Sequence, residues 1–403
     1  MIIKEGCKIN SKHEAGAQML GYLYQVRFAL YMLLKNDNLE AQISIEKFDD
    51  VSFETSGTPY ELIQLKHHTN KVGSLSNKSV DLWRTLKVWI DMINSDKTLL
   101  ETTYFVIITT AQVNEGTAAF KINKNEYSEA YSILEETAKN STNQENKSFY
   151  QSFLSMDEKE IKNLLSHIRI VSSAPDIVDV LEDIKKILKY SCPFEYLDTV
   201  TERVEGWWFK EVIRALKSDD AVIMSQRQLQ FKVREISQQY DEDNLPIDFG
   251  ELDPIDEKDL DSKDRLFLEQ LRLIKTSSAT LSIALSDYYR ASMQRSSWIR
   301  QGLLYADELE SYERRLKDSW ERAFAIMQDN LQEYGNATDS EKEKEGRKLY
   351  SHVSNSDIRI RDKCYESYVM HGTYHIMANS LTVGWHIDFI KKLEHLLEGT
   401  CCE

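Results

Sequence analysis

Three short β-strand patterns, set between two helical patterns, limit what the start of this chain can fold into. The strand patterns occupy residues 42–46, 51–54 and 61–67. The flanking helical patterns and a following β-branched, apolar run occupy residues 15–35, 79–94 and 103–110. Apolar spacing near 3.6 residues indicates helices, and alternation or a short β-branched run indicates strands. We therefore expect a helix, three strands, a helix and a buried strand, packed as α/β layers around a mixed sheet.

The remaining chain looks mainly helical. A possible strand at 167–172 closes the first region, and Ala174-Pro175 opens the next. Residues 241–264 hold eleven acids against two lysines, as in an acidic linker or surface loop. Helical patterns cover residues 176–240, 265–303 and 305–334, and a final helical region ends near Leu397. We predict an α+β chain in three parts: an α/β domain at 1–172, a helical connector at 173–264 and an α-helical partner-binding domain at 265–403.

The net charge of −16 is unevenly distributed. Residues 1–100 contain 12 basic and 12 acidic residues, so the whole excess of acid lies beyond residue 100. A neutral domain can bind DNA when its charges are sorted by face, whereas the acidic remainder is a poor non-specific DNA surface. We therefore place any DNA contact in the first domain. The acidic part would meet a protein partner or help to keep the chain off DNA.

Cysteine usage and hydropathy point to a reducing compartment. The five cysteines form neither a disulfide framework nor a C-x-x-C zinc spacing: Cys7, Cys192, Cys364, Cys401 and Cys402. The N-terminus lacks signal-peptide character, and no apolar run is long enough to span a bilayer. We predict a cytoplasmic protein with no membrane partner.

One carboxylate and a Gln-x-Lys pair suggest chemistry. Asp50 follows the first strand pattern, and Gln64 and Lys66 stand two residues apart on the third. Side chains at i and i+2 share a strand face, so Gln64 and Lys66 can converge, and a neighbouring strand can bring Asp50 to them. Such a set suits phosphodiester cleavage assisted by Mg²⁺ or Mn²⁺, with Asp50 and Gln64 as metal ligands. Lys66 would orient water or offset phosphate charge.

The same residues also fit an ordinary structural role. Asp49-Asp50 is a common turn pair, and Gln64 and Lys66 fit the solvent face of a half-exposed strand. Glu46 is either a second ligand or a strand end facing water. Gln25 and His68 are accessory candidates near the site. Basic side chains that could contact the DNA backbone, or simply be solvated, are Lys71, Lys78 and Arg84.

Three histidines near the C-terminus invite a metal interpretation that their spacing does not favour. His371 and His375 are four residues apart, as on one helix face, yet Gly372 stands where the H-E-x-x-H motif needs glutamate. We therefore predict packing or interface roles for His371, His375 and His386. With Trp385 they form a distinctive local cluster that indicates no particular reaction.

Four segments of the first domain resemble effector nucleases of bacterial anti-phage systems. They are Gly21-Tyr22-x-Tyr24-Gln25, Glu46-x-x-Asp49-Asp50-Val51, Ile63-Gln64-Leu65-Lys66-His67-His68 and Asp81-Leu82-Trp83-x-Thr85-Leu86. They are similar to a double-stranded-DNA endonuclease domain of the PD-(D/E)xK superfamily. The resemblance implies a restriction-endonuclease-like α/β/α fold, with Asp50, Gln64 and Lys66 in the D…(D/E/Q)xK places. Gln64 stands where many members have an acid, and a neutral amide gives the metal less charge.

The tail resembles the C-terminal region of effectors in ABC three-component systems, the group that includes Lamassu. Its segments are His371-Gly372-x-x-His375-x-Met377-Ala378-Asn379 and Val383-Gly384-Trp385-His386-x-Asp388-Phe389. This resemblance implies an SMC-like coiled-coil ATPase and a small third subunit as partners. In that scheme the partners restrain the nuclease, and release with self-association into a homo-oligomer activates it.

Two functions follow as hypotheses. The first is a Mg²⁺-dependent DNA endonuclease that serves as a defence effector. The second is a non-catalytic scaffold that keeps a nuclease fold for DNA binding or partner docking, which Gln64 and the net charge of −16 favour. Cleavage of RNA is not excluded by the residues, although no aromatic platform for reading RNA is apparent.

Overall fold

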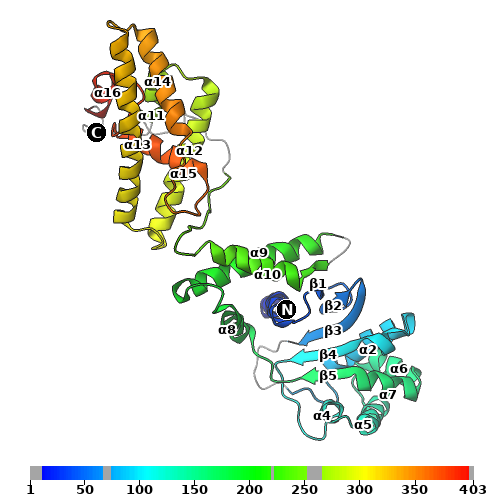
Figure 1. Cartoon of the computed structure of the whole chain (residues 1–403). Helices are drawn as coiled ribbons and strands as arrows, with labels where there is room; N and C mark the ends of the chain where they lie inside the picture. Colours follow the sequence, from blue (N-terminus) through cyan, green and yellow to red (C-terminus); the bar gives the residue numbers. More distant parts are fainter. Residues whose placement is uncertain (1–10, 67–73, 219–221, 252–265, 399–403) are drawn as a thin grey trace, which may run out of the picture. The chain divides into compact units, whose positions relative to one another are not determined.

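The computed structural model describes residues 11–66, 74–218, 222–251 and 266–398 of the 403 (Figure 1). The chain divides into two compact units, residues 1–237 and residues 238–403, which we name unit 1 and unit 2. Each unit has its own hydrophobic core and is described by itself.

Unit 1 is built on a mixed sheet, whose described strands run in the order β5-β4-β3-β2-β1-β6. The strands are β1 (Gln42–Ile45), β2 (Val51–Thr55), β3 (Thr58–Lys66), β4 (Tyr104–Thr109), β5 (Ile168–Val171) and β6 (Val222–Ser225). β4 is parallel to both β3 and β5, whereas the other neighbouring pairs are antiparallel. The first five strands fall on predicted segments, so the expected mixed sheet is confirmed.

The hairpin between β2 and β3 fixes which residues of these two strands lie opposite each other. Ser56 and Gly57 have φ angles of 53° and 83°. Positive φ at both central residues defines a type I′ turn, whose twist matches that of the paired strands. The turn is therefore only two residues long, and β3 begins at Thr58, earlier than the predicted residue 61. Pairing of Val51 with Ile63 then brings Asp50 beside the last residues of β3.

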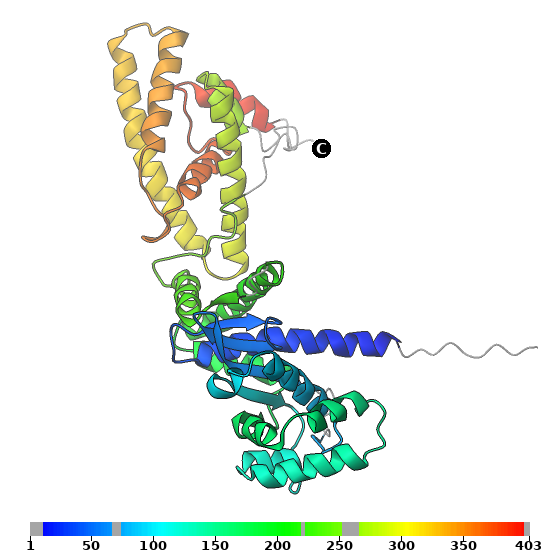
Figure 2. The same ribbon diagram turned by 90° about the vertical axis from the view of Figure 1, so that its right-hand side faces the viewer.

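Helices cover both faces of this sheet (Figure 1). On one face, α1 packs against α8 and α9. The other face carries α2 and the group α4 to α7. The bounds are α1 (Ser11–Lys35), α2 (Val80–Ser95), α3 (Leu99–Thr102), α4 (Ala118–Asn123), α5 (Tyr127–Asn140), α6 (Lys147–Ser155), α7 (Glu158–His167), α8 (Ile177–Leu188), α9 (Leu197–Leu216) and α10 (Gln226–Gln238). Figure 2 shows the first turns of α1 extending beyond the sheet.

α2 shows how the sequence directs the packing of unit 1. It buries the four side chains predicted to face the core: Leu82, Leu86, Trp89 and Ile93. They join Leu62 of β3 and Phe105 of β4 in one hydrophobic cluster. Burying a side chain of this size stabilises a fold by about 1.5–3 kcal/mol. The α2 face of the sheet is therefore firmly covered along β3 and β4.

Unit 1 extends beyond the predicted boundary at residue 172, because residues 173–237 pack on its sheet. β6, which the helical pattern at 176–240 did not reveal, pairs with β1 through Met224 opposite Ile43. Trp208 of α9 donates its indole N–H to the Val26 carbonyl of α1 at 2.7 Å. The predicted connector is therefore part of unit 1. Of the predicted acidic loop, residues 241–251 lie in unit 2 and the rest lie outside the described residues.

Every regular element in the described residues of unit 2 is an α-helix. Its helices are α11 (Leu266–Leu273), α12 (Ser278–Arg300), α13 (Ala306–Glu333), α14 (Asp339–Ser354), α15 (Ser367–Asn379) and α16 (Phe389–Glu398). The predicted helical C-terminal region is thereby confirmed, but the pattern at 265–303 forms two helices. Lys275 adopts a φ of 54°, and the Ser277 hydroxyl accepts from Thr280 N to begin α12.

α12 and α15 approach closely at Gly372. A Cβ atom at that position would collide with the Asp287 carbonyl oxygen and the Ala291 side chain of α12. Glycine is therefore required for this helix crossing. None of the helices in the described parts of either unit combines the length and apolarity needed to span a lipid bilayer.

Candidate active site

An open cleft of about 460 Å³ lies where β3 ends in unit 1. It is formed by α1, the β1–β2 connection, the end of β3 and the first turn of α2. Its lining residues are Gln18, Gly21, Tyr22, Gln25, Glu46, Asp50, Leu65, Lys66 and Asp81. Four predicted site residues therefore meet here: Gln25, Glu46, Asp50 and Lys66. Gln64 does not line the cleft.

Asp50 and Lys66 face each other at the end of β3. The Leu65 backbone N–H donates to Asp50 Oδ2 at 2.8 Å. Lys66 Nζ lies 3.9 Å from the same oxygen. The Asp50 and Lys66 side chains are 14% and 17% exposed, so both are largely desolvated yet open to the cleft. A backbone donor thus orients the carboxylate, and an ammonium group lies next to it.

Glu46 enters the cleft from a strained backbone position. Its φ of 57° lies in the left-handed region, which non-glycine residues rarely adopt. The turn is closed by Glu46 N, which donates to the Asp50 carbonyl at 3.3 Å. Partial burial is the main cause that raises the pKa of the Glu46 carboxyl, followed by the nearby charges of Asp50 and Asp49. Lys66 opposes this shift.

Gln64 points to the α2 side of the sheet. Its Nε2 donates to Asp49 Oδ1, and its Oε1 accepts from the Thr85 hydroxyl at 3.3 Å. Only 8% of Gln64 is exposed. Gln64 shares a strand face with Lys66 as expected, but Thr85 and Trp89 of α2 cover that face before the cleft begins. The structure therefore does not bring Gln64 together with Asp50 and Lys66 around one point.

Asp49 is a buried carboxylate beside the cleft. It accepts from Trp89 Nε1 at 2.6 Å and from the Asp50 backbone N–H at 2.9 Å, in addition to Gln64. Burial raises the pKa of Asp49 to about 6, and the hydrogen bonds from Trp89 and Gln64 oppose the shift. Sequence reasoning treated Asp49 only as part of a turn. The paired aspartates at positions 49 and 50 were the available signal, but both lie in the bend between β1 and β2, where the sequence pattern does not fix the direction of a side chain.

The remaining predicted residues divide into two groups. Lys78 and Arg84 are exposed, and Arg84 Nη2 lies 3.9 Å from Glu145 Oε1 on an equally exposed side chain. Such surface pairs contribute little to stability, so Arg84 is accessible to an anionic ligand. His68 and Lys71 lie outside the described residues. Asp81, at the start of α2, lines the cleft although it was not singled out as a ligand.

The cleft offers oxygen donors that fit Mg²⁺ or Mn²⁺, although it lacks a complete set of acidic ligands. Among the described residues, no three His, Cys, Asp or Glu side chains are grouped to hold a metal ion. Asp50 and Glu46 supply carboxylates. The Lys66 carbonyl accepts from Thr110 N near β4, so the peptide groups of Leu65 face the other way, toward Asp50. Two carboxylates and the Leu65 carbonyl suit a cation that keeps several waters.

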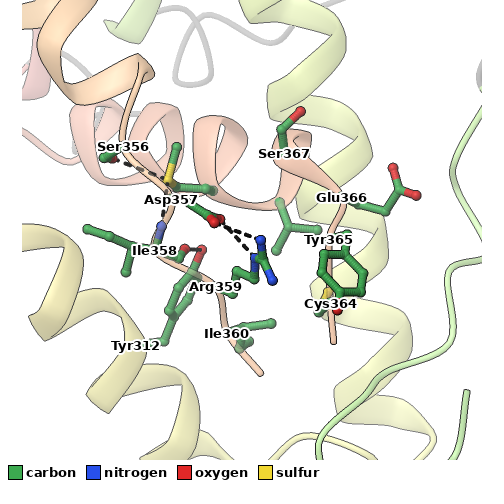
Figure 3. Close-up of a pocket in the computed structure, with 12 residues that line it drawn as sticks. Tyr312, Ser356, Asp357, Ile358, Arg359, Ile360, Cys364, Tyr365, Glu366 and Ser367 are labelled. Carbon is green, nitrogen blue, oxygen red and sulfur yellow. Dashed lines mark hydrogen bonds and ion pairs between the residues drawn. The ribbon is translucent and has the colours of Figure 1, made fainter. Parts of the chain in front are cut away.

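A second cavity, in unit 2, is too small for a nucleotide. It measures about 50 Å³ and lies between Tyr312 of α13 and the segment that leads to α15 (Figure 3). The polar groups around it are internally bonded. Arg359 pairs with Asp357 at 2.7 Å, and the Tyr312 hydroxyl donates to the Ile358 carbonyl at 3.0 Å. The space suits a few waters rather than a substrate.

Two of the C-terminal histidines, His375 and His386, are buried in unit 2, and His371 is partly exposed. His371 Nδ1 is 3.4 Å from Asp287 Oδ2, and its Nε2 is 3.0 Å from the Ser354 carbonyl. His375 and His386 are each 1% exposed. His386 Nδ1 accepts from Asp388 N at 3.0 Å. Burial lowers the pKa of His375 to about 4. These contacts support packing roles and give no metal site among the described residues.

A comparison with protein families finds a match in unit 2. Residues 267–393 match the family model for C-terminal domain 7 of the ABC-three component (ABC-3C) systems. The matched segment covers 127 of the 403 residues, all of them in unit 2. No curated protein matches the chain.

Solved structures that resemble the chain include Cap4 SAVED/CARF-domain containing receptors. That of Moraxella osloensis is 14% identical, with a TM-score of 0.34, and the match covers 69% of this chain and 62% of that chain. For Acinetobacter baumannii Cap4 with 2'3'3'-cAAA, the identity is 15%, the TM-score 0.31 and the coverage 69% and 59%. With 3'3'3'-cAAA the corresponding values are 12%, 0.32, 68% and 69%.

Proposed function

We propose that this chain is a Mg²⁺-dependent DNA endonuclease, and that unit 1 is a restriction-endonuclease-like domain. It would serve as the effector of an ABC three-component defence system. The observation that carries the proposal is the cleft at the end of β3, where Asp50 and Glu46 meet Lys66. Carboxylates with an adjacent ammonium group suit hydrolysis of a phosphodiester.

Each cleft residue would have a distinct task. Asp50, Glu46 and the Leu65 carbonyl would hold the metal, because they present oxygen atoms to one space. When bound, Mg²⁺ would lower the pKa of a water and offset negative charge on the phosphate. Lys66 Nζ, 3.9 Å from Asp50, would orient the scissile phosphate and balance charge that develops on it. Lys78 and Arg84 would contact the DNA backbone.

Unit 2 would connect the nuclease to its partners. The match to C-terminal domain 7 supports a role within a multi-component complex. We propose that unit 2 docks on an SMC-like ATPase and a small third subunit, in an arrangement of the Lamassu kind. The partners would restrain cleavage until release allows self-association. The net charge of −16 favours this arrangement, because the acidic remainder of the chain would itself bind DNA poorly.

The proposal is tested with linear and supercoiled plasmid. The purified chain would be incubated with Mg²⁺, Mn²⁺ or EDTA, alone and with the proposed ATPase partner. We expect cleavage that requires a divalent cation, either from the chain alone or after release from the ATPase. Cleavage that persists in EDTA would contradict the assigned chemistry.

One observation favours a second candidate, a non-catalytic scaffold. Position 64 holds a neutral amide where many members of the superfamily have an acid, and this amide is bonded to Asp49 and Thr85 and does not line the cleft. A scaffold would bind DNA or partner subunits without cutting. Metal-independent DNA binding with no cleavage under any condition, in the fully reconstituted complex, would favour the scaffold over the enzyme.

A further inference from the structure

The contacts of Gln64 give it a task other than binding metal. Its amide nitrogen donates to Asp49 Oδ1, and its amide oxygen accepts from Thr85. Gln64 is 8% exposed and does not line the cleft. The four residues Asp49, Gln64, Thr85 and Trp89 form one hydrogen-bonded group, which we name the Asp49 network.

The orientation of the Gln64 amide follows from the donors around Asp49. The Asp50 backbone N–H and the Trp89 indole N–H can only donate, so the Asp49 carboxylate acts as their acceptor. Gln64 must then present its NH₂ group to the same carboxylate, because its carbonyl oxygen would repel it. The Thr85 hydroxyl in turn donates to Gln64 Oε1 at 3.3 Å. All three elements, β3, α2 and the β1–β2 connection, are joined in this way.

The Asp49 network ends on the backbone of Asp50. Asp49 Oδ1 accepts from Asp50 N at 2.9 Å, while the Asp50 carboxylate accepts from Leu65 N at 2.8 Å. Asp50 is therefore held at its peptide group and at its side chain. If Gln64 loses its donor, Asp49 keeps Trp89 but loses its tie to β3, and the Asp50 turn can shift away from Lys66.

We propose that Gln64 is a positioning residue, which fixes Asp50 toward the cleft through the Asp49 network and does not itself bind metal. The metal in this inference rests on the proposed function. The Asp49 network is defined without it, so the two can fail separately.

The substitution Gln64→Glu separates the two roles. If position 64 supplies a metal ligand, the new carboxylate would add negative charge, and the variant would bind Mn²⁺ as tightly as wild type or more tightly. If position 64 instead positions Asp50, the substitution would place a second carboxylate against the buried Asp49. We expect Mn²⁺ affinity, measured by titration calorimetry at pH 8, to fall about tenfold or more. Equal or tighter binding by Gln64→Glu would overturn the proposal.

Two further variants test whether the fall in Mn²⁺ affinity reflects a general loss of folding. Thr85→Val removes one hydroxyl that cannot reach a metal in the cleft, and we expect a smaller loss of Mn²⁺ affinity in the same direction. Gln144→Glu adds the same charge at an exposed position between α5 and α6 and should leave Mn²⁺ affinity unchanged. Wild-type Mn²⁺ affinity in the Thr85→Val variant would contradict the proposal that Gln64 positions Asp50 through the Asp49 network.

A thermal double-mutant cycle tests the Asp49 network without any metal. We expect Gln64→Glu to lower the unfolding midpoint of unit 1 by about 5–10 °C, and Asp49→Asn to restore much of that loss in the double variant. Additive effects of the two substitutions would refute the network. If wild type fails to bind Mn²⁺ while the cycle shows coupling, the metal assignment fails and the contact between Gln64 and Asp49 stands.

Discussion

Two groups of acidic and basic side chains, one in each unit, have different surroundings. In the cleft of unit 1, Asp50 and Lys66 are 3.9 Å apart, partly exposed and backed by few other polar partners. In unit 2, Asp287, His371 and His375 lie between α12 and α15, where Asp287 and His375 are 8% and 1% exposed. The first arrangement leaves charge available to a ligand. The second uses charge to fix two helices against each other.

This difference implies that the two groups respond oppositely to substitution. Cleft residues should be needed for activity and contribute little to folding, because their charges are incompletely compensated. Buried residues of unit 2 should be needed for folding and leave the chemistry of the cleft unchanged. Five substitutions, described in order of decreasing expected effect, test this contrast.

Asp50→Asn should give the largest loss of activity among these five substitutions. The variant keeps an oxygen for the Leu65 N–H but removes the negative charge beside Lys66, so cleavage should fall on the order of 10³-fold. The unfolding midpoint should stay within a few degrees of wild type. Plasmid cleavage and calorimetry measure both, and a variant that unfolds early without a specific loss of cleavage would place Asp50 among the structural residues.

Gly372→Ala should give the largest loss of stability in unit 2. The added Cβ meets the Asp287 carbonyl and Ala291, so α12 and α15 must separate. We expect a cost of about 3–5 kcal/mol in the free energy of unfolding, measured by denaturant titration. Ala284→Gly at another buried position of α12 provides a comparison without a clash. Wild-type stability of Gly372→Ala would show that the helix crossing is not tightly packed.

His375 should make unit 2 less stable in acid. Its folded pKa of about 4 lies below the ordinary value of 6.5, so the unfolded chain binds a proton that the folded chain excludes. The stabilisation is complete above pH 6.5 and is lost as pH falls toward 4, by at most about 3 kcal/mol.

The neighbouring charged groups modify that pH dependence. Asp287 raises the pKa of His375, and His371 lowers it. His371 itself has a raised pKa, chiefly from Asp287, so its contribution is present in acid and lost as pH rises through its folded pKa. His375→Gln should flatten the loss of stability between pH 6.5 and pH 4, whereas His371→Gln removes a charge that lowers the pKa of His375 and should flatten the loss only in part. Denaturant titrations between pH 4 and pH 6.5 measure the free energy of unfolding. If its dependence on pH is the same in His375→Gln as in wild type, His375 is not the source of the acid sensitivity.

Glu46→Gly should give the smallest effect, with opposite signs in stability and activity. Glycine relieves the left-handed backbone at a φ of 57° and removes a carboxyl that is crowded by Asp50 and Asp49. The free energy of unfolding should rise by about 0.5–1 kcal/mol, while Mn²⁺ affinity falls. A loss of stability would show that Glu46 holds the turn rather than serving the cleft.

Much of unit 1 could be predicted because its core elements carry strong periodic signals. The apolar stripe of α2 identifies a helix that packs on the sheet, and the β-branched run of β4 identifies a buried strand of that sheet. β6 could not be predicted, since four residues without alternation look like part of the helices around them. The boundary at 172 failed for a related reason. Ala174-Pro175 is a turn within unit 1, and the Pro175 carbonyl accepts from the Tyr24 hydroxyl of α1 at 3.0 Å.

The candidate site was predictable only in part. Period-two alternation correctly puts Gln64 and Lys66 on one strand face. It cannot show that Thr85 and Trp89 of α2 cover Gln64 while Lys66 reaches the cleft. Asp49 and Asp50 are neighbours in sequence but have different surroundings, one buried against α2 and one facing the cleft. Only the packing of α2 against the sheet separates their roles.

The most direct measurement is plasmid cleavage by the Lys66→Ala variant beside wild type and Lys139→Ala, in Mg²⁺ or Mn²⁺, with and without the proposed ATPase partner. Lys139 is an exposed lysine of α5 that pairs with Glu135, so its loss controls for surface charge. The account predicts that Lys66→Ala abolishes cleavage while it folds and assembles like wild type, and that Lys139→Ala cuts normally. Cleavage by Lys66→Ala at the wild-type rate would contradict the assignment of the cleft as the active site.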